Sequence, residues 1–301
     1  RLVRKLGSGG MGAVWLAHDL SLESSCALKL IDGEKAQNGE VRIRFEREAK
    51  AAAQLRGAHV VDVFDHGEWE GMLYIVMEYL EGEDLGARLD RLGSLDGETT
   101  YRIVAQVARA LVRAHAHGIV HRDLKPENIF IVQGDEEEIA KVLDFGIAKV
   151  NTQSLSGDVA TRTGAVMGTP YYMSPEQIGG SKSVDHRTDL WALGVIACEC
   201  ATGRRPFDAD TIGGLVLAIC ATPIPAASSL GAVAPGFDAW AARALERDVT
   251  RRFQSARELA DALRALLGNT AAMANQMLDH GQLWSLFENE CWQALEKRFQ
   301  G

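Results

Sequence analysis

Six short segments hold residue types that could do chemistry, and they occur in a fixed order along the chain. They read GSGGMGAV from Gly7, CALK from Cys26, FEREAK from Phe45, HRDLKPEN from His121, DFG from Asp144 and SPE from Ser174. Together they offer a glycine-rich loop for phosphates, a lysine ammonium, and hard oxygen ligands for a divalent metal ion. Phosphoryl transfer needs such groups, because it depends on positioning and charge neutralisation rather than on covalent chemistry.

The spacing of Gly7, Gly9 and Gly12 is shared by two phosphate-binding architectures, and the element that follows the glycines distinguishes them. A dinucleotide-binding unit continues as a helix. Here the chain continues as AVWLAHD. Apolar residues occupy both the odd and the even positions of this run, which predicts a strand buried on both sides. The acidic residue that a dinucleotide site requires exists as Asp32, but it follows a second apolar run, CALKL. We therefore expect a strand hairpin and not a dinucleotide-dependent oxidoreductase.

The elements around these segments predict an α+β fold. Up to about Tyr79 the pattern is strand, glycine turn and strand, then a charged helix near FEREAK, then strands that end in MLYIVMEYL. Beyond residue 84 helical spacing dominates, and the acidic run at 134–138 is interpreted as a solvated hairpin tip. The helix that ends at Gly118 should bury one stripe: Ile103, Val107, Ala110, Leu111 and Ala114.

Composition excludes several classes of protein. The 301 residues are 47% hydrophobic and 24% charged, which is ordinary for a globular chain. The net charge of −9 argues against a nucleic-acid partner. Five cysteines without metal-type spacing favour a reducing, cytoplasmic setting. No apolar stretch is long enough to cross a membrane. Since the chain starts at Arg1 without a methionine or a signal segment, we expect a piece of a longer polypeptide.

From Arg1 to about Leu267 the ordered segments resemble the protein kinase family. The loop HRDLKPEN is similar to that of its serine/threonine branch, because Lys125 follows Asp123 by two residues, and GGMG and GTPYYMSPEQ resemble bacterial, eukaryotic-like (Hanks-type) kinases. The resemblance implies a bilobal protein-kinase-like fold. Residues 1–80 would form a small lobe with an antiparallel sheet, one helix and a hinge at its end, and residues 81–268 a larger, mainly helical lobe with an activation segment at 144–176.

The resemblance also implies an activity and its catalytic residues. The chain would be an ATP- and Mg²⁺-dependent kinase, with Mn²⁺ as the alternative metal, acting on serine and threonine hydroxyls of proteins. Asp123 would accept the hydroxyl proton and Lys125 would neutralise the transferring phosphoryl group. Lys29 would contact the α- and β-phosphates, held in place by Glu48. Glu46 competes for that role but lies about 200° around the same helix.

The nucleotide would lie under the glycine loop and against the hinge. Asn128 and Asp144 match the family's metal ligands, and Met77 matches the residue at the back of the adenine pocket. The nucleotide-binding residues implied by the resemblance are Gly7, Ser8, Gly9, Gly10, Gly12, Val14, Ala27, Lys29, Met77, Glu78, Leu80, Asn128 and Asp144.

The resemblance predicts regulation and structural support as well. Thr161 and Thr163 match loop positions that are phosphorylated in related kinases, and the Arg122 side chain would pair with such a phosphate. We therefore expect autophosphorylation. Asp189 would brace the catalytic loop. Glu176 and Arg252 would form a buried ion pair. His121 is expected to be a packed structural histidine, and the other seven histidines show no evident site.

Alternatives remain open at the level of the sequence. A nucleotide-binding pseudokinase scaffold would lack one of the catalytic residues, and a small-molecule kinase would lack the long activation segment. Residues 269–301 predict a helical extension with an apolar stripe. This extension could pack on the larger lobe, regulate by occupying a groove, or dock a partner or a second copy, and self-association through the small lobe is another option. The stripe consists of Trp284, Phe287, Cys291 and Leu295.

Overall fold

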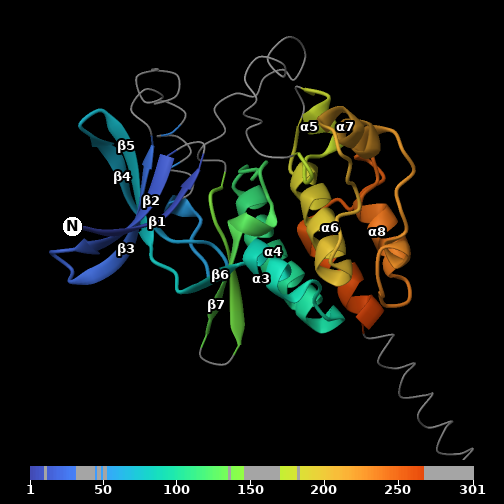
Figure 1. The fold of residues 1–301 in the computed structure, drawn as a ribbon, viewed down its shortest axis with the longest axis horizontal. Coiled ribbons are helices and arrows are strands. Elements are labelled where there is room, and N and C mark those ends of the chain that lie inside the picture. Colours follow the sequence, from blue (N-terminus) through green and yellow to red (C-terminus); the bar gives the residue numbers. More distant parts are fainter. Residues whose placement is uncertain are drawn as a thin grey trace, which may run out of the picture.

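A five-stranded antiparallel sheet forms one end of the molecule (Figure 1). The structure is a computed structural model that describes residues 1–9, 12–31, 45, 49, 53–134, 137–145, 170–181 and 184–267. In this sheet the strands follow the order β1-β2-β3-β5-β4. Their bounds are β1 Leu2–Gly9, β2 Gly12–Asp19, β3 Ser24–Ile31, β4 Val63–Trp69 and β5 Met72–Glu78.

The glycine-rich segment joins two strands, as the sequence predicted. β1 and β2 pair antiparallel, with Gly9 opposite Gly12. Gly12 adopts φ +145°, and a Cβ there would lie 1.8 Å from the carbonyl oxygen of Leu30, so the fold itself requires glycine at this position. The expectation that β2 is buried on both sides was wrong. Its residues are half-buried except Ala17, because β2 lies beside the edge strand β1.

Alternation from Ala27 to Ile31 of β3, and along the whole of β5, gives these strands one buried face. Ala27, Lys29 and Ile31 of β3 are buried, and β5 buries every second residue in the same way. Phe45, within the predicted charged helix, is helical and packs against Ile31 and Ile75 on this face. The buried face therefore carries Lys29 among apolar neighbours.

A second, three-stranded sheet lies between the first sheet and the helices (Figure 1). It consists of β6 (Gly82–Asp84), β7 (Ile129–Gln133) and β8 (Glu138–Val142). The β7–β8 pairing confirms the hairpin at the acidic run, but Glu138 is not part of a solvated tip. It opens β8, and its carboxylate binds Arg88 at 2.7 Å.

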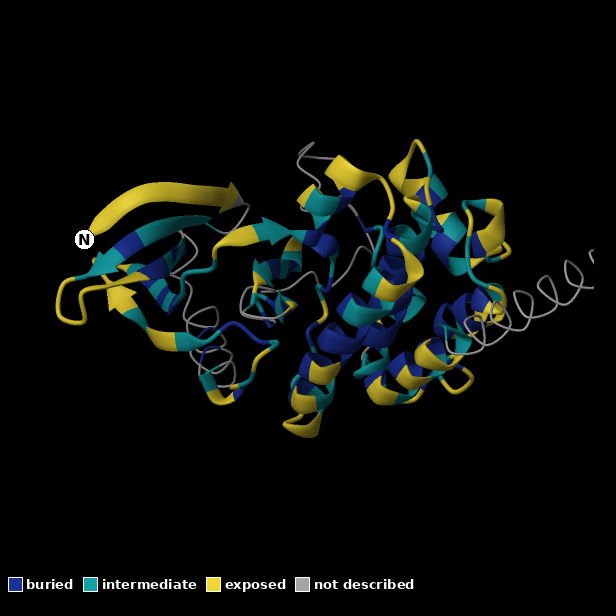
Figure 2. Cartoon of the chain, turned by 90° about the horizontal axis from the view of Figure 1, so that it is seen from below, coloured by how far each residue is buried: buried dark blue, intermediate teal, exposed yellow. Residues whose placement is uncertain are grey.

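The rest of the described chain is mainly helical (Figure 1). α4 begins after Asp96, whose carboxylate caps the Thr99 amide, and its predicted stripe is fully confirmed as buried. Most of α6 is buried, and Figure 2 shows the burial concentrated in this helical half, whereas the strand at the N-terminus is exposed. The helices are α3 Leu85–Leu92, α4 Gly97–Ala116, α5 Pro175–Ile178, α6 Arg187–Thr202, α7 Ile212–Cys220, α8 Phe237–Ala244 and a last one at 256–267, with short 3₁₀ turns at Pro126–Asn128 and Ala227–Ser229.

These elements confirm the α+β fold class. No helix in the described part of the chain is long and apolar enough to cross a membrane. The four cysteines in that part are free thiols. Several predictions fall on residues outside the described ranges and stay predictions: Gly10, Glu46, Glu48, Thr161, Thr163 and the extension at 269–301.

Candidate active site

The loop that carries Asp123 is fixed by the carboxylate of Asp189. Asp189 lies at the start of α6 and is 1% exposed. It accepts hydrogen bonds from the backbone amides of His121 (2.9 Å) and Arg122 (2.8 Å). Its Oδ2 also lies 2.8 Å from Nε2 of His115 on α4. The predicted bracing role of Asp189 is therefore confirmed, and His115, for which no site was predicted, is its third partner.

His121 links the catalytic loop to the DFG segment. Its Nδ1 accepts the Asp123 amide at 3.2 Å, so its Nε2 carries the proton that is donated to the Leu143 carbonyl at 2.9 Å. The ring also meets the edge of Phe145, with centroids 5.0 Å apart. Because both ring nitrogens are engaged and the residue is fully buried, His121 is the packed structural histidine that was predicted.

Two residues at this junction adopt strained backbone conformations. Arg122 has φ +62° and Asp144 has φ +52°, a region that side chains with a Cβ avoid. Arg122 is held on both sides, since its amide binds Asp189 and its carbonyl accepts Nε2 of Gln177 at 2.8 Å. Such strain persists only where the surrounding contacts determine it, and it is typical of functional loops.

Lys29 and Asp144 meet at the centre of the site. The Lys29 ammonium lies 2.7 Å from Oδ2 of Asp144. The Lys29 side chain is 11% exposed and that of Asp144 is 34% exposed, so the pair is partly desolvated and its carboxylate still meets solvent. The contact brings together a lysine from β3 and a carboxylate 115 residues later, as phosphate and metal binding at one site would need.

Asn128 and Asp144 have the chemistry of a magnesium site. Nδ2 of Asn128 donates to the Asp123 carbonyl at 2.8 Å, which leaves the amide oxygen of Asn128 available as a ligand. The backbone amide of Leu143 donates to the Asn128 carbonyl at 2.8 Å and so ties the segment of Asn128 to that of Asp144. One carboxylate and one amide oxygen suit Mg²⁺, which completes its shell with substrate phosphates and water. These residues therefore fit the ion that the resemblance implies.

An apolar cluster lies where the resemblance predicts the adenine. Ala27 of β3 pairs with Met77 of β5, and both are buried in this cluster. The predicted residues Val14 and Leu80 pack against it. Two members were not predicted. They are Val61 and Leu143.

The predicted hinge residue Glu78 has a structural task for its side chain. Its carboxylate binds the Lys141 ammonium of β8 at 2.6 Å and accepts the backbone amide of Asp62 at 2.8 Å. Its own amide donates to the Asp62 carbonyl at 2.9 Å. The Glu78 side chain thus joins the first sheet to the second, so the predicted contact of Glu78 with a base would have to be made by its backbone.

The glycines of the first hairpin differ in what the fold demands of them. A Cβ at Gly7 would meet nothing within 4 Å, in contrast to Gly12. Ser8 beside it is exposed. The fold therefore gives no steric reason for glycine at position 7, whereas a ligand that approaches the backbone closely would.

Residues 170–181 are anchored to the helical half. Glu176 binds the fully buried Arg252 through two hydrogen bonds of 2.9 and 3.2 Å, as predicted. The Tyr172 hydroxyl donates to Glu199 of α6 at 2.6 Å, and burial raises the pKa of both groups. Lys125 is half-buried in the loop beside Asp123.

Comparisons with known proteins agree with this geometry. Residues 1–259 match the family described as protein kinase domain. The chain is 45% identical over 216 residues to serine/threonine-protein kinase pkn3 of Myxococcus xanthus, which covers 71% of this chain and 39% of that protein. It is 38% identical over 284 residues to serine/threonine-protein kinase PknD of Mycobacterium tuberculosis, covering 93% of this chain and 42% of that protein.

The solved structures point the same way. The crystal structure of the Mycobacterium tuberculosis PknI kinase domain matches with a TM-score of 0.70 and 32% sequence identity, covering 88% of this chain and 95% of that one. The chain spans about two fifths of the length of pkn3 and PknD.

Proposed function

Because the chain belongs to the protein kinase domain family and is similar over 71% and 93% of its length to two serine/threonine-protein kinases, we propose that it transfers the γ-phosphoryl group of ATP to serine and threonine hydroxyls of proteins. The observation that carries the proposal is the contact of Lys29 with Asp144 beside a catalytic loop that Asp189 holds in place. In this proposal residues 1–80 bind the nucleotide, and residues 81–268 supply the catalytic and substrate-binding groups.

The nucleotide is held by an apolar slot and a polar end. Adenine lies against Ala27 and Met77, and the hinge backbone from Glu78 to Leu80 binds its edge. The glycine hairpin covers the phosphates, and Lys29 binds the α- and β-phosphates. Asn128 and Asp144 would hold Mg²⁺, which neutralises charge on the phosphate oxygens when it is bound.

The chemistry requires one proton acceptor and one further cation. Asp123 accepts the proton of the attacking hydroxyl, and its loop is fixed before substrate arrives because three hydrogen-bond donors converge on Asp189. Lys125, two residues later, neutralises charge on the transferring group. Preorganised groups of this kind lower the barrier, since no reorganisation is needed as charge develops.

Regulation by the activation segment is part of the proposal. The Arg122 side chain is exposed next to Asp123, and a phosphate on Thr161 or Thr163 would have this guanidinium as a partner. The free thiols of the described chain suit a reducing, cytoplasmic location.

The test is phosphate incorporation measured by intact mass and site mapping after incubation with ATP and Mg²⁺. We expect the chain to gain phosphate at Thr161 or Thr163 and to phosphorylate a serine-containing peptide. Lys29→Met and Asp144→Asn should abolish both reactions, whereas the exposed Lys5→Met on β1 should not. A chain that binds ATP but transfers no phosphate would overturn the proposal and identify a scaffold.

A further inference from the structure

The helix α7 carries an exposed apolar face on the helical half (Figure 1). Its nine residues, IGGLVLAIC, include no polar side chain. Leu215 and Ile219 are buried in the core, so the opposite side of the same helix faces outward. On the outside Leu217 is 57% exposed, and Ile212 in the first turn is 40% exposed. A helix that is apolar all round is normally buried, so this face calls for a cover that the described residues do not supply.

Small residues leave room on this face for a second helix. A Cβ at Gly213 would meet nothing within 4 Å, so open space lies above that position. Gly213, Leu217 and Cys220 follow one another at steps of four and three residues, which places them on one stripe of the helix. Cys220 is half-buried and is a free thiol. The face therefore presents a protruding leucine next to a gap that a large side chain would fill.

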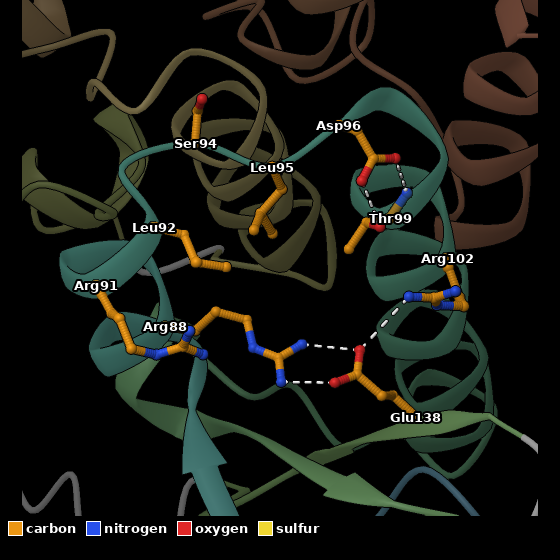
Figure 3. A pocket seen from close by; sticks show the side chains of 9 residues that line it. All are labelled: Arg88, Arg91, Leu92, Ser94, Leu95, Asp96, Thr99, Arg102 and Glu138. Carbon is orange, nitrogen blue, oxygen red and sulfur yellow. Dashed lines mark hydrogen bonds and ion pairs between the residues drawn. The ribbon is translucent and has the colours of Figure 1, made fainter.

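The helical half offers no similar face among its described residues. Apart from the two side chains on α7, the exposed large hydrophobic residue of the described residues 81–267 is Leu92, at 52%. Leu92 lines a pocket together with Arg88 and Arg91, and Arg88 is paired there with Glu138 (Figure 3). Leu92 thus lies among charged groups, whereas the exposed residues of α7 lie on a helix that has none.

The extension at 269–301 carries an apolar stripe of matching length. The spacing of four residues predicts that they share one face of a helix: Trp284, Phe287, Cys291 and Leu295. A helix rises about 17 Å over this stripe, and α7 is about 14 Å long. Residues 268–283 connect the last described helix to the stripe, and an extended chain of that length spans up to roughly 55 Å. A globular chain of this size has a radius of gyration of about 18 Å, so α7 is within reach.

A segment of the same chain suits this face better than a second molecule does. The exposed side of α7 is about 14 Å long and roughly 10 Å wide. A standard interface between two proteins buries about 800 Å² on each partner, which is far more than this face provides. A tethered segment needs less area, because its linker holds it at an effective concentration in the millimolar range.

We propose that the apolar stripe of the extension docks on the exposed face of α7 within the same chain. The Trp284 side chain fills the open space at Gly213 and contacts Leu217. The two helices then run parallel and Cys291 lies beside Cys220, because each of the two cysteines follows its partner at position 284 or 213 by seven residues. This docking goes beyond phosphoryl transfer and does not depend on it.

The first test is crosslinking of the full chain with a short bismaleimide, followed by peptide mapping and intact mass. We expect a crosslink between Cys220 and Cys291 in chains that keep the mass of a monomer. The remaining cysteines should not react, because they are buried: Cys26, Cys198 and Cys200. A crosslink confined to species with the mass of a dimer would overturn the proposal and assign the face to a second copy. No crosslink in the unmodified chain would overturn it as well.

Variants on both sides of the contact separate docking from chance collisions. Leu217→Asp on α7 and Trp284→Asp in the extension should each lower the crosslink yield about tenfold. Leu217 is mostly exposed, so the fold should tolerate the change. Leu92→Asp, which alters an exposed leucine outside α7, should leave the yield within about twofold. An equal loss in Leu92→Asp would contradict the proposal.

Chymotrypsin provides a second readout that uses no cysteine. Cleavage after Trp284 and Phe287 should be several times faster in Leu217→Asp than in the unmodified chain, because docking covers these aromatic side chains. Equal cleavage rates would overturn the proposal. Neither readout uses phosphate transfer, so a chain without kinase activity would give the same result.

Discussion

Arg251 and Arg252 are neighbours in sequence, and the structure predicts opposite consequences of replacing them. The Arg252 side chain is 0% exposed, and it donates to both carboxylate oxygens of Glu176 and to the carbonyls of Glu246 and Arg187. Arg251 is 73% exposed and lies 3.8 Å from the Glu246 carboxylate. Arg252→Met would leave the Glu176 carboxylate, itself 15% exposed, without its cation and would leave two carbonyls without this donor.

The expected magnitudes are well separated. Breaking a buried pair by removing one partner costs about 3 to 5 kcal/mol, whereas an exposed pair contributes about 0 to 1 kcal/mol. At about 2 to 4 °C per kcal/mol for a chain of this size, Arg252→Met should lower Tm by roughly 6 to 20 °C. Arg251→Met should lower Tm by less than about 4 °C. Methionine keeps an apolar side chain next to Trp191, over which the Arg252 guanidinium now lies at 5.1 Å.

Differential scanning calorimetry of the two variants measures the difference directly. Glu176→Gln added to Arg252→Met should recover part of the loss, since it removes the unpaired charge. Equal Tm values for Arg251→Met and Arg252→Met would refute the reasoning, because burial would then not determine how much each arginine contributes to stability.

Three further predictions concern the hairpin, the catalytic loop and the buried thiols. Gly7→Ala should leave Tm within about 2 °C but raise KM for ATP, as measured by thermal melts and steady-state kinetics. Gly12→Ala should lower Tm, because of these two glycines only Gly12 has a positive φ and no room for a Cβ. A Tm for Gly7→Ala that falls by more than this would contradict the reasoning. Asp189→Ala should lower kcat by about tenfold to a hundredfold and raise KM for ATP by a smaller factor, because the amides of His121 and Arg122 lose their acceptor. An unchanged kcat in the same kinetics would exclude a bracing role. Burial raises the pKa of Cys198 to about 12 and also raises that of Cys200. The unfolded chain therefore releases these protons at lower pH than the folded chain, and the free energy of unfolding falls as pH rises above about 9. Urea unfolding at pH 7 and 10 should show a smaller fall in this free energy for Cys198→Ala than for the unmodified chain, and an equal fall would show that these thiols do not titrate as described.

Local patterns in the sequence predicted much of the fold. The alternation in CALKL and MLYIVME gives two strands with one buried face, and the stripe of the helix that ends before Gly118 is buried as its spacing requires. The motifs also predicted that Asp189 holds the catalytic loop and that Glu176 pairs with Arg252. These predictions held because each depends on residues that the motif itself specifies.

Contacts between distant segments could not be predicted in this way. His115 meets Asp189 across 74 residues, and Lys141 meets Glu78 across 63. Neither contact follows from local spacing, because each depends on how α4 packs on α6 or how β8 lies against β5. Glu138 illustrates the same limit. In sequence it is one of several acidic residues in a turn, and only the tertiary structure places Arg88 opposite it.

The central claim is that Asp123 accepts the proton of the substrate hydroxyl and is not needed for ATP binding. The most direct measurement compares Asp123→Asn with the unmodified chain, for ATP affinity by calorimetry and for the rate of phosphate transfer to a serine peptide. The account predicts an ATP Kd within about twofold and a transfer rate reduced by about 10²-fold to 10⁴-fold. Transfer retained at the rate of the unmodified chain would contradict it.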